Sequence, residues 1–228
     1  MKNSLIVSVA VAGMFLLNLN VMAQSGNGSQ NQVVTGSKTL SSSNMDFKTD
    51  MRVLWGNQSM LTHNVILCIV DGQPGIDEAK NMLVKNQEAI GNSFAIYYGE
   101  EAGKKLTKLL YRNATIAADI MIATRNENYG VYVKAYKTWK DNTGQILAFL
   151  NQTNPNWNLN NLKTMMYDQI QFTTNEATDI KNKNFDGGTK AYNNASKAET
   201  VMADIFSDGI ISQFPAKFSE LALAVNQK

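Results

Sequence analysis

The chain has 228 residues, with 21 Lys and Arg against 19 Asp and Glu, and a formal net charge of +2. This near-neutral balance gives no electrostatic reason to expect nucleic acid or an anionic membrane as a partner. The single cysteine, Cys68, excludes an internal disulfide, so the folded state must be stabilised by a packed core. Because His63 is the only histidine, any site that needs two imidazoles is excluded.

Residues 1–23 have the pattern of a signal peptide. Lys2 precedes the apolar run LIVSVAVAGMFLL, which is shorter than a membrane-spanning helix requires. The following VMA places small residues before Gln24, so cleavage is expected after Ala23. No cysteine follows the apolar run, and a lipoprotein anchor is therefore not expected. The cleaved protein should be periplasmic or secreted, without an integral membrane span.

Residues 24–45, QSGNGSQNQVVTGSKTLSSSNM, are rich in Gly, Ser, Asn and Gln. Such a segment cannot bury enough apolar surface to offset its ordering entropy, so it is predicted to be a flexible linker. A single helical domain is expected over residues 46–218, followed by a C-terminal tail over residues 219–228.

Between linker and tail, apolar residues recur at three- and four-residue spacing, which predicts helices. The predicted helices are separated by DGQPG, Gly99, NPNWN, DGG and Pro215. They cover residues 46–70, 77–98, 100–126, 128–152, 159–183 and 189–213. Because the connections are short, neighbouring helices should be antiparallel. The fold class is therefore an all-α antiparallel bundle of about six helices: four long core helices, with segment 77–98 and a tail helix beside them.

In three of these segments an apolar pair is followed, three residues later, by an amide. The segments are LWGNQSMLT, LLYRNATIA and MMYDQIQFTT. Gln58 with Thr62, and Gln169 with Thr173, make polar pairs on one helix face, and Asn113 is the looser third copy. One interpretation is a polar cluster in the bundle core, where helical proteins often build ligand sites. The other is three amides on helix surfaces, which the residues alone favour because the chain is rich in Asn.

Carboxylates are the other candidate ligands. Asp50, Glu176 and Asp204 lie on different predicted helices and, with His63, form a weak candidate set for a metal ion. Helix surfaces produce such spacings by chance, so a solvated face is the favoured interpretation. The sequence contains no Gly-rich phosphate loop, no C-x-x-C, no H-E-x-x-H and no G-x-S-x-G elbow. No catalytic residue and no cofactor are therefore expected.

Several stretches together resemble a family of small exported bacterial helical proteins that are often labelled "glycosyltransferase" or "acetylglutamate kinase". The stretches are DMRVLWGNQSMLT, IGNSFAIYYGEEAGKKLTKLL, FLNQTNPNWNLNNLKTMMYDQIQFTTNEA and MADIFSDGIISQFPAKF, and the resemblance covers most of residues 49–218. Those labels look like transferred names, since nothing in the chain resembles a nucleotide-sugar fold or an amino-acid kinase.

The family usually has histidine at the positions that match Gln58, Asn113 and Gln169, and often another near Ala198. In such relatives the histidines imply a metal or haem site. This chain has amides instead, which bind first-row metals poorly and cannot act as acids or bases near neutral pH. Asp50, Glu176 and Asp204 do match the family pattern.

The resemblance therefore favours an exported, non-enzymatic binding or structural protein, with an amide-lined polar core in place of a histidine site. Its partner would be a small-molecule ligand or an envelope protein. Two alternatives stay open: a bundle that binds metal weakly through its carboxylates and His63, and an enzyme that matches the family's glycosyltransferase label.

Overall fold

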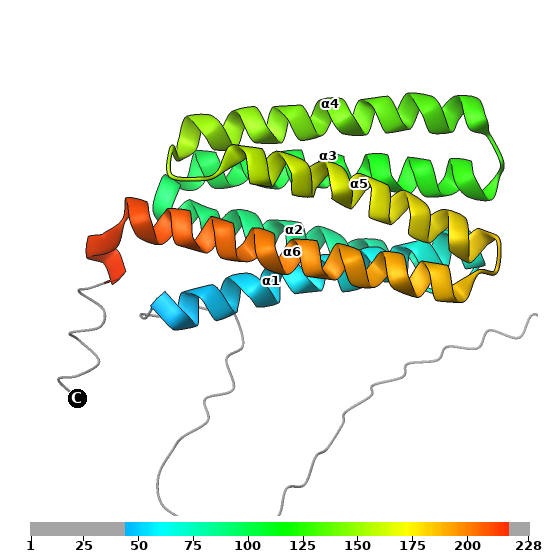
Figure 1. Cartoon of the computed structure of the whole chain (residues 1–228), viewed down its shortest axis with the longest axis horizontal. Helices are drawn as coiled ribbons and strands as arrows, with labels where there is room; N and C mark the ends of the chain where they lie inside the picture. Colours follow the sequence, from blue (N-terminus) through cyan, green and yellow to red (C-terminus); the bar gives the residue numbers. More distant parts are fainter. Residues whose placement is uncertain (1–43, 219–228) are drawn as a thin grey trace, which may run out of the picture. The chain divides into compact units, whose positions relative to one another are not determined.

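The computed structural model describes residues 44–218, and in this range it contains helices and no strands (Figure 1). The all-α prediction is therefore confirmed. The predicted signal peptide, most of the predicted linker and the predicted tail lie outside the described residues. The elements are α1 (Asn44–Ile66), the short π-helix η1 (Leu67–Asp71), α2 (Ile76–Tyr98), α3 (Glu100–Arg125), α4 (Tyr129–Thr153), α5 (Leu159–Lys181) and α6 (Phe185–Gln213).

Each α-helix packs against the next one in the chain, and α6 packs against α1, so the contacts link the six helices into a closed ring. α3 also contacts α5 across the ring. The six helices are 23 to 29 residues long, so α2, predicted beside the core helices, is as long as α1 and α5 and belongs to the bundle. None of the helices in the described range is both long and apolar enough to cross a bilayer.

Two predicted helix starts need correction. Asn44 and Met45, predicted in the linker, belong to the first turn of α1. The DGG stretch, predicted as a separator, lies inside the first turn of α6. Asn184 explains this second shift, because its side-chain oxygen accepts a hydrogen bond from the backbone N–H of Gly187 at 3.2 Å and caps the helix before DGG.

The turns after α1, α3 and α5 share one backbone feature. Gly72, Glu127 and Lys183 have φ angles of 78°, 54° and 61°, in the left-handed region that non-glycine residues rarely adopt. These residues are evenly spaced along the chain. The chain thus consists of three helical hairpins, α1–α2, α3–α4 and α5–α6, each of which turns in a similar way.

The core has two apolar clusters. In one, Trp55 stacks on Phe206 with ring centroids 4.9 Å apart, and Trp157 meets Phe206 edge-on at 5.3 Å. The other contains Ile120, Met121 and Trp139, and it fills the half of the bundle that includes η1. Burial of these side chains is the main stabilising term, and it leaves a central zone where the two clusters meet.

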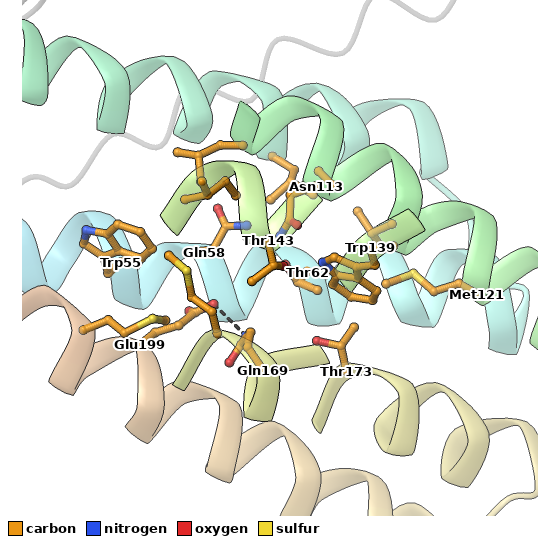
Figure 2. A pocket seen from close by; sticks show the side chains of 18 residues that line it. Trp55, Gln58, Thr62, Asn113, Met121, Trp139, Thr143, Gln169, Thr173 and Glu199 are labelled. Atoms are coloured by element: carbon orange, nitrogen blue, oxygen red, sulfur yellow. Dashed lines mark hydrogen bonds between the residues drawn. The ribbon is translucent and has the colours of Figure 1, made fainter. Parts of the chain in front are cut away.

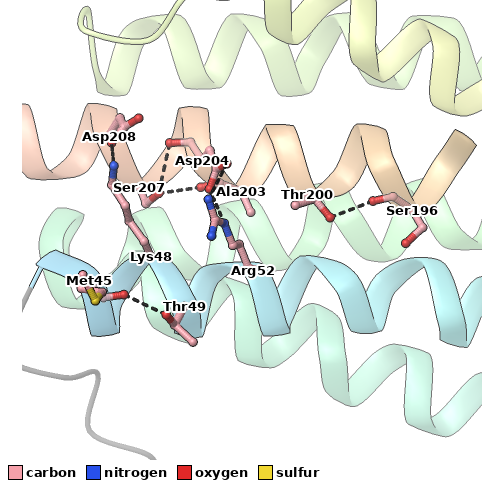
Figure 3. A network of polar contacts seen from close by, with 10 residues as sticks. All are labelled: Met45, Lys48, Thr49, Arg52, Ser196, Thr200, Ala203, Asp204, Ser207 and Asp208. Atoms are coloured by element: carbon pink, nitrogen blue, oxygen red, sulfur yellow. Dashed lines mark hydrogen bonds and ion pairs between the residues drawn. The ribbon is translucent and has the colours of Figure 1, made fainter.

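Ion pairs align α6 along α1 on the surface (Figure 3). The guanidinium of Arg52 donates two hydrogen bonds to Asp204, at 2.6 and 2.9 Å, and Lys48 pairs with Asp208. Because both pairs are solvent-exposed, they contribute less to stability than the buried clusters do. Their spacing of one helical turn sets the register of the two helices.

Candidate functional site

A cavity of about 60 Å³ lies in the central zone, and its wall includes side chains from both apolar clusters. All five residues of the predicted polar core line it: Gln58, Thr62, Asn113, Gln169 and Thr173 (Figure 2). The three amides, which the residues alone placed on helix surfaces, therefore converge in space. They come from α1, α3 and α5, which are the first helices of the three hairpins.

Among the residues that each of these first helices presents to the cavity, three recur at the same spacing, separated by three and then four residues. Residues at these spacings share one helix face. In chain order, the first position is apolar, the second is an amide and the third is Thr or Ala. The three sets are Trp55, Gln58 and Thr62; Leu110, Asn113 and Ala117; and Met166, Gln169 and Thr173.

A second layer of amides orients Gln58. The side-chain nitrogen of Asn86 on α2 donates to the backbone oxygen of Leu54 at 3.2 Å and to Gln58 Oε1 at 3.1 Å. Gln87 Nε2 donates to the same Gln58 oxygen at 3.0 Å. Asn86 and Gln87 are both buried, so these bonds are shielded from water.

The same arrangement recurs in the second hairpin. Asn142 on α4 is fully buried, and its side-chain nitrogen donates to the backbone oxygen of Leu109 at 3.1 Å and to Asn113 Oδ1 at 3.3 Å. In both hairpins, then, a buried Asn of the second helix bridges the cavity amide and the carbonyl one turn before it. The bonded side chains are 28 and 29 residues apart in the sequence.

The third hairpin departs from this arrangement because Glu199 replaces the bridging Asn, 30 residues after its partner Gln169. Gln169 Nε2 donates to Glu199 Oε1 at 2.8 Å, and the hydroxyl of Ser59 donates to Glu199 Oε2. Gln169 Oε1 is consequently left buried, with no hydrogen-bond partner among the described residues. Among the described residues, Trp55, Gln87, Thr124 and Asn142 also have a buried polar atom without a partner, so this feature is not particular to Gln169.

Burial decides the charge of Glu199, whose side chain is only 2 % exposed. Desolvation raises its pKa to about 8, although the hydrogen bonds from Ser59 lower it and the nearby charge of Glu176 adds to the rise. A carboxyl group with this pKa is largely neutral at pH 7. The polar groups of the cavity wall therefore carry little charge.

The structure does not gather the weak metal candidates into one site. His63 Nδ1 contacts Glu176 Oε1, and the ring of Tyr192 packs on His63 with centroids 4.8 Å apart. Asp204 is engaged by Arg52. Within residues 44–218, no three His, Cys, Asp or Glu side chains lie close enough together to hold a metal ion.

Sequence reasoning missed the second layer, Asn86, Gln87 and Asn142, and it missed Glu199. A signal for them was present, because Asn86, Asn142 and Glu199 follow the three repeated amides at nearly constant intervals. This signal appears only when whole hairpins are compared with one another. A comparison of their first helices alone does not show it.

Comparison with protein-family models, with curated proteins and with solved structures finds no match to this chain. The resemblance to small exported bacterial helical proteins therefore stays a prediction. The site is interpreted from its geometry, which offers neutral hydrogen-bonding groups around one cavity.

Proposed function

We propose that this protein is an exported, non-enzymatic binding protein that holds a small, polar, uncharged molecule in its central cavity. The proposal is supported by the convergence of Gln58, Asn113 and Gln169 on one cavity. Most protein ligand sites share this design, in which apolar walls carry a few convergent polar groups.

The observation that carries the proposal is the way the cavity wall is held. Buried amides on the next helix fix the positions of Gln58 and Asn113 before any ligand binds.

The volume limits the size of the ligand. A buried water needs roughly 10–15 Å³ of cavity volume. A cavity of about 60 Å³ can therefore hold a few waters or a ligand of only a few heavy atoms. The amides are suited to recognition rather than to proton transfer, because they neither gain nor lose a proton near neutral pH.

Export is the second part of the proposal, and residues 1–23 support it through their charged start, apolar run and small-residue junction. The expected product begins at Gln24. Intact-mass measurement of the protein recovered from the culture medium and from the periplasm checks this prediction. A full-length chain that stays in the cytoplasm would contradict it.

Filling the cavity tests the binding function. Ala117 is 5 % exposed and lines the cavity, whereas its neighbour Ala118 faces an outer groove between α2 and α3. We expect Ala117→Leu to abolish the binding of neutral polar fragments of up to about six heavy atoms, while Ala118→Leu leaves it unchanged. Ligand-observed NMR measures both. Equal binding by the two variants, or no binding by the unmodified protein, would refute the proposal.

A further inference from the structure

Trp139 of α4 presents its indole N–H to the cavity. The residue is 3 % exposed and lines the cavity, and its ring nitrogen is turned toward the interior (Figure 2). A buried indole N–H usually has an acceptor, as Trp157 does in the backbone oxygen of Phe206 at 3.2 Å. The Trp139 nitrogen makes no hydrogen bond with the described residues. It is therefore available to a molecule in the cavity.

Three threonines of the wall also keep their hydroxyl groups available. Threonines in helices often donate to a backbone oxygen one turn before, as Thr164 and Thr178 do at 3.1 and 2.8 Å. Thr62, Thr143 and Thr173 line the cavity, and within the described part of the chain they make neither this bond nor another. Thr143 lies four residues after Trp139, so both project from one face of α4.

A molecule in the cavity can reach these groups. Some described residues have a buried polar atom with neither a partner nor accessible surface, such as the nitrogen of Trp55 and Oε1 of Gln169. The Trp139 nitrogen and the three threonine oxygens are not among these atoms. They have no partner, so they keep accessible surface, and the residues that carry them line the cavity.

The second-layer hydrogen bonds leave two amide nitrogens available as well. Asn86 bonds a backbone carbonyl and Gln58, and a carbonyl only accepts, so the nitrogen of Asn86 meets the Gln58 oxygen. The same argument applied to Asn142 shows that it meets the Asn113 oxygen. The nitrogens of Gln58 and Asn113 are not among the atoms without accessible surface, and both residues line the cavity.

The accessible polar groups of the wall are therefore mainly donors. An indole or amide nitrogen only donates, whereas a hydroxyl donates one hydrogen bond and can also accept. Each of these groups can donate, and only the hydroxyls can accept. Glu199 and Gln169 add little, because each oxygen of Glu199 already accepts a hydrogen bond and the nitrogen of Gln169 is bonded to it.

We infer that the cavity binds a small neutral hydrogen-bond acceptor, such as a molecule with a carbonyl oxygen, and that Trp139 and Thr143 are contact residues for it. The inference rests on the proposed binding function and specifies the ligand class and these contacts. Of the described residues that line the cavity, only Glu199 is ionisable, and neither Lys nor Arg is among them. An anion would therefore lose its hydration without gaining a counter-charge.

Three probes of matched size test the ligand class on the isotope-labelled protein at pH 7. Acetamide has a carbonyl oxygen, isobutene has the same branched shape without an acceptor, and acetate is an anion. The indole N–H resonances report the contact, and Trp→Phe variants assign them. We expect acetamide to move the resonance of Trp139 to higher frequency. The resonances of Trp55, which has no accessible nitrogen, and Trp157, which is already bonded, should move far less.

Trp139→Phe removes the N–H and keeps an aromatic ring in the core. We expect it to lower the affinity for acetamide roughly tenfold, because one hydrogen bond is lost. The affinity for isobutene should not fall, since isobutene forms no hydrogen bond. The resonance shift on the unmodified protein tests the inference even if this variant fails to fold.

Thr143→Val removes a hydroxyl that the fold does not use. It should weaken acetamide binding in the same way, without lowering the free energy of unfolding. Thr174→Val is the matched control, because Thr174 is also 2 % exposed but its hydroxyl donates to the backbone oxygen of Gln171 at 3.0 Å. This control should lower the free energy of unfolding and leave acetamide binding unchanged.

The outcomes separate the two proposals. If acetamide binds without moving the Trp139 resonance, or binds equally to Thr143→Val and the unmodified protein, the inference is overturned while the binding function stands. Tightest binding of acetate would also overturn the ligand class. If no probe binds and neutral fragments also fail to bind, the binding function itself is refuted.

Discussion

At the residue scale, the positions of Gln58, Asn113 and Gln169 on one helix face could be predicted from sequence, because the helical period fixes which residues point the same way. Their convergence on one cavity could not. It depends on how α1, α3 and α5 pack, and local spacing carries no information about that packing. The orientation of each amide depends in turn on Asn86, Asn142 and Glu199, which lie on other helices.

Glu199 gives a pH prediction at this scale. Its folded-state pKa of about 8 lies above the ordinary 4.5, so the folded protein binds more protons than the unfolded chain between these values. The free energy of unfolding should therefore fall as pH rises from about 5 to about 8, by up to about 1.4 kcal/mol per pH unit. Burial also raises the pKa of Glu176, which adds to the slope in the same direction.

Urea unfolding at a series of pH values checks this expectation. Glu199→Gln keeps a side chain that can bond Ser59 and Gln169, and it should flatten the slope. Glu78→Gln, at an exposed position, is the control and should leave the slope unchanged. An unaltered slope in Glu199→Gln would show that this carboxyl group does not titrate as its burial implies.

At the element scale, the apolar periodicity of the sequence predicted the helices. Their exact ends depend on local capping interactions instead. The DGG stretch illustrates the difference. Gly-rich sequence predicts a break, yet the cap from Asn184 starts α6 before the glycines. Gly188 then lies against Ile180 of the preceding helix, where an added Cβ would come within 3.0 Å of a side-chain carbon. These glycines allow close packing between helices rather than ending one.

α2 and α3 approach each other closely at Gly91 and Gly103. A Cβ on Gly103 would lie 2.6 Å from the Gly91 backbone oxygen and 2.6 Å from the Ala95 Cβ. We therefore expect Gly103→Ala to push the two helices apart and to lower the free energy of unfolding by about 1–3 kcal/mol.

Gly144→Ala on α4 is the matched control, because no atom lies within 4 Å of its added Cβ. It should raise the free energy of unfolding by roughly 0.5–1 kcal/mol, since Ala favours the helix more than Gly does. Urea denaturation followed by circular dichroism measures both. Equal effects of the two changes would contradict the close approach of α2 and α3.

At the scale of the whole molecule, three similar hairpins surround a cavity that is not symmetric. Two hairpins bridge their cavity amide with a buried Asn, and the third uses Glu199. This one difference changes which end of the amide is bonded. Gln169 turns its side-chain nitrogen toward the second helix of its hairpin, whereas Gln58 and Asn113 turn their oxygens toward it.

The most direct measurement is a high-resolution crystal structure of the protein soaked in acetamide. The amide should occupy the cavity, within hydrogen-bonding distance of the side chains of Gln58 and Asn113. A cavity that holds ordered water alone, with acetamide only on the outer surface, would contradict the proposed binding site.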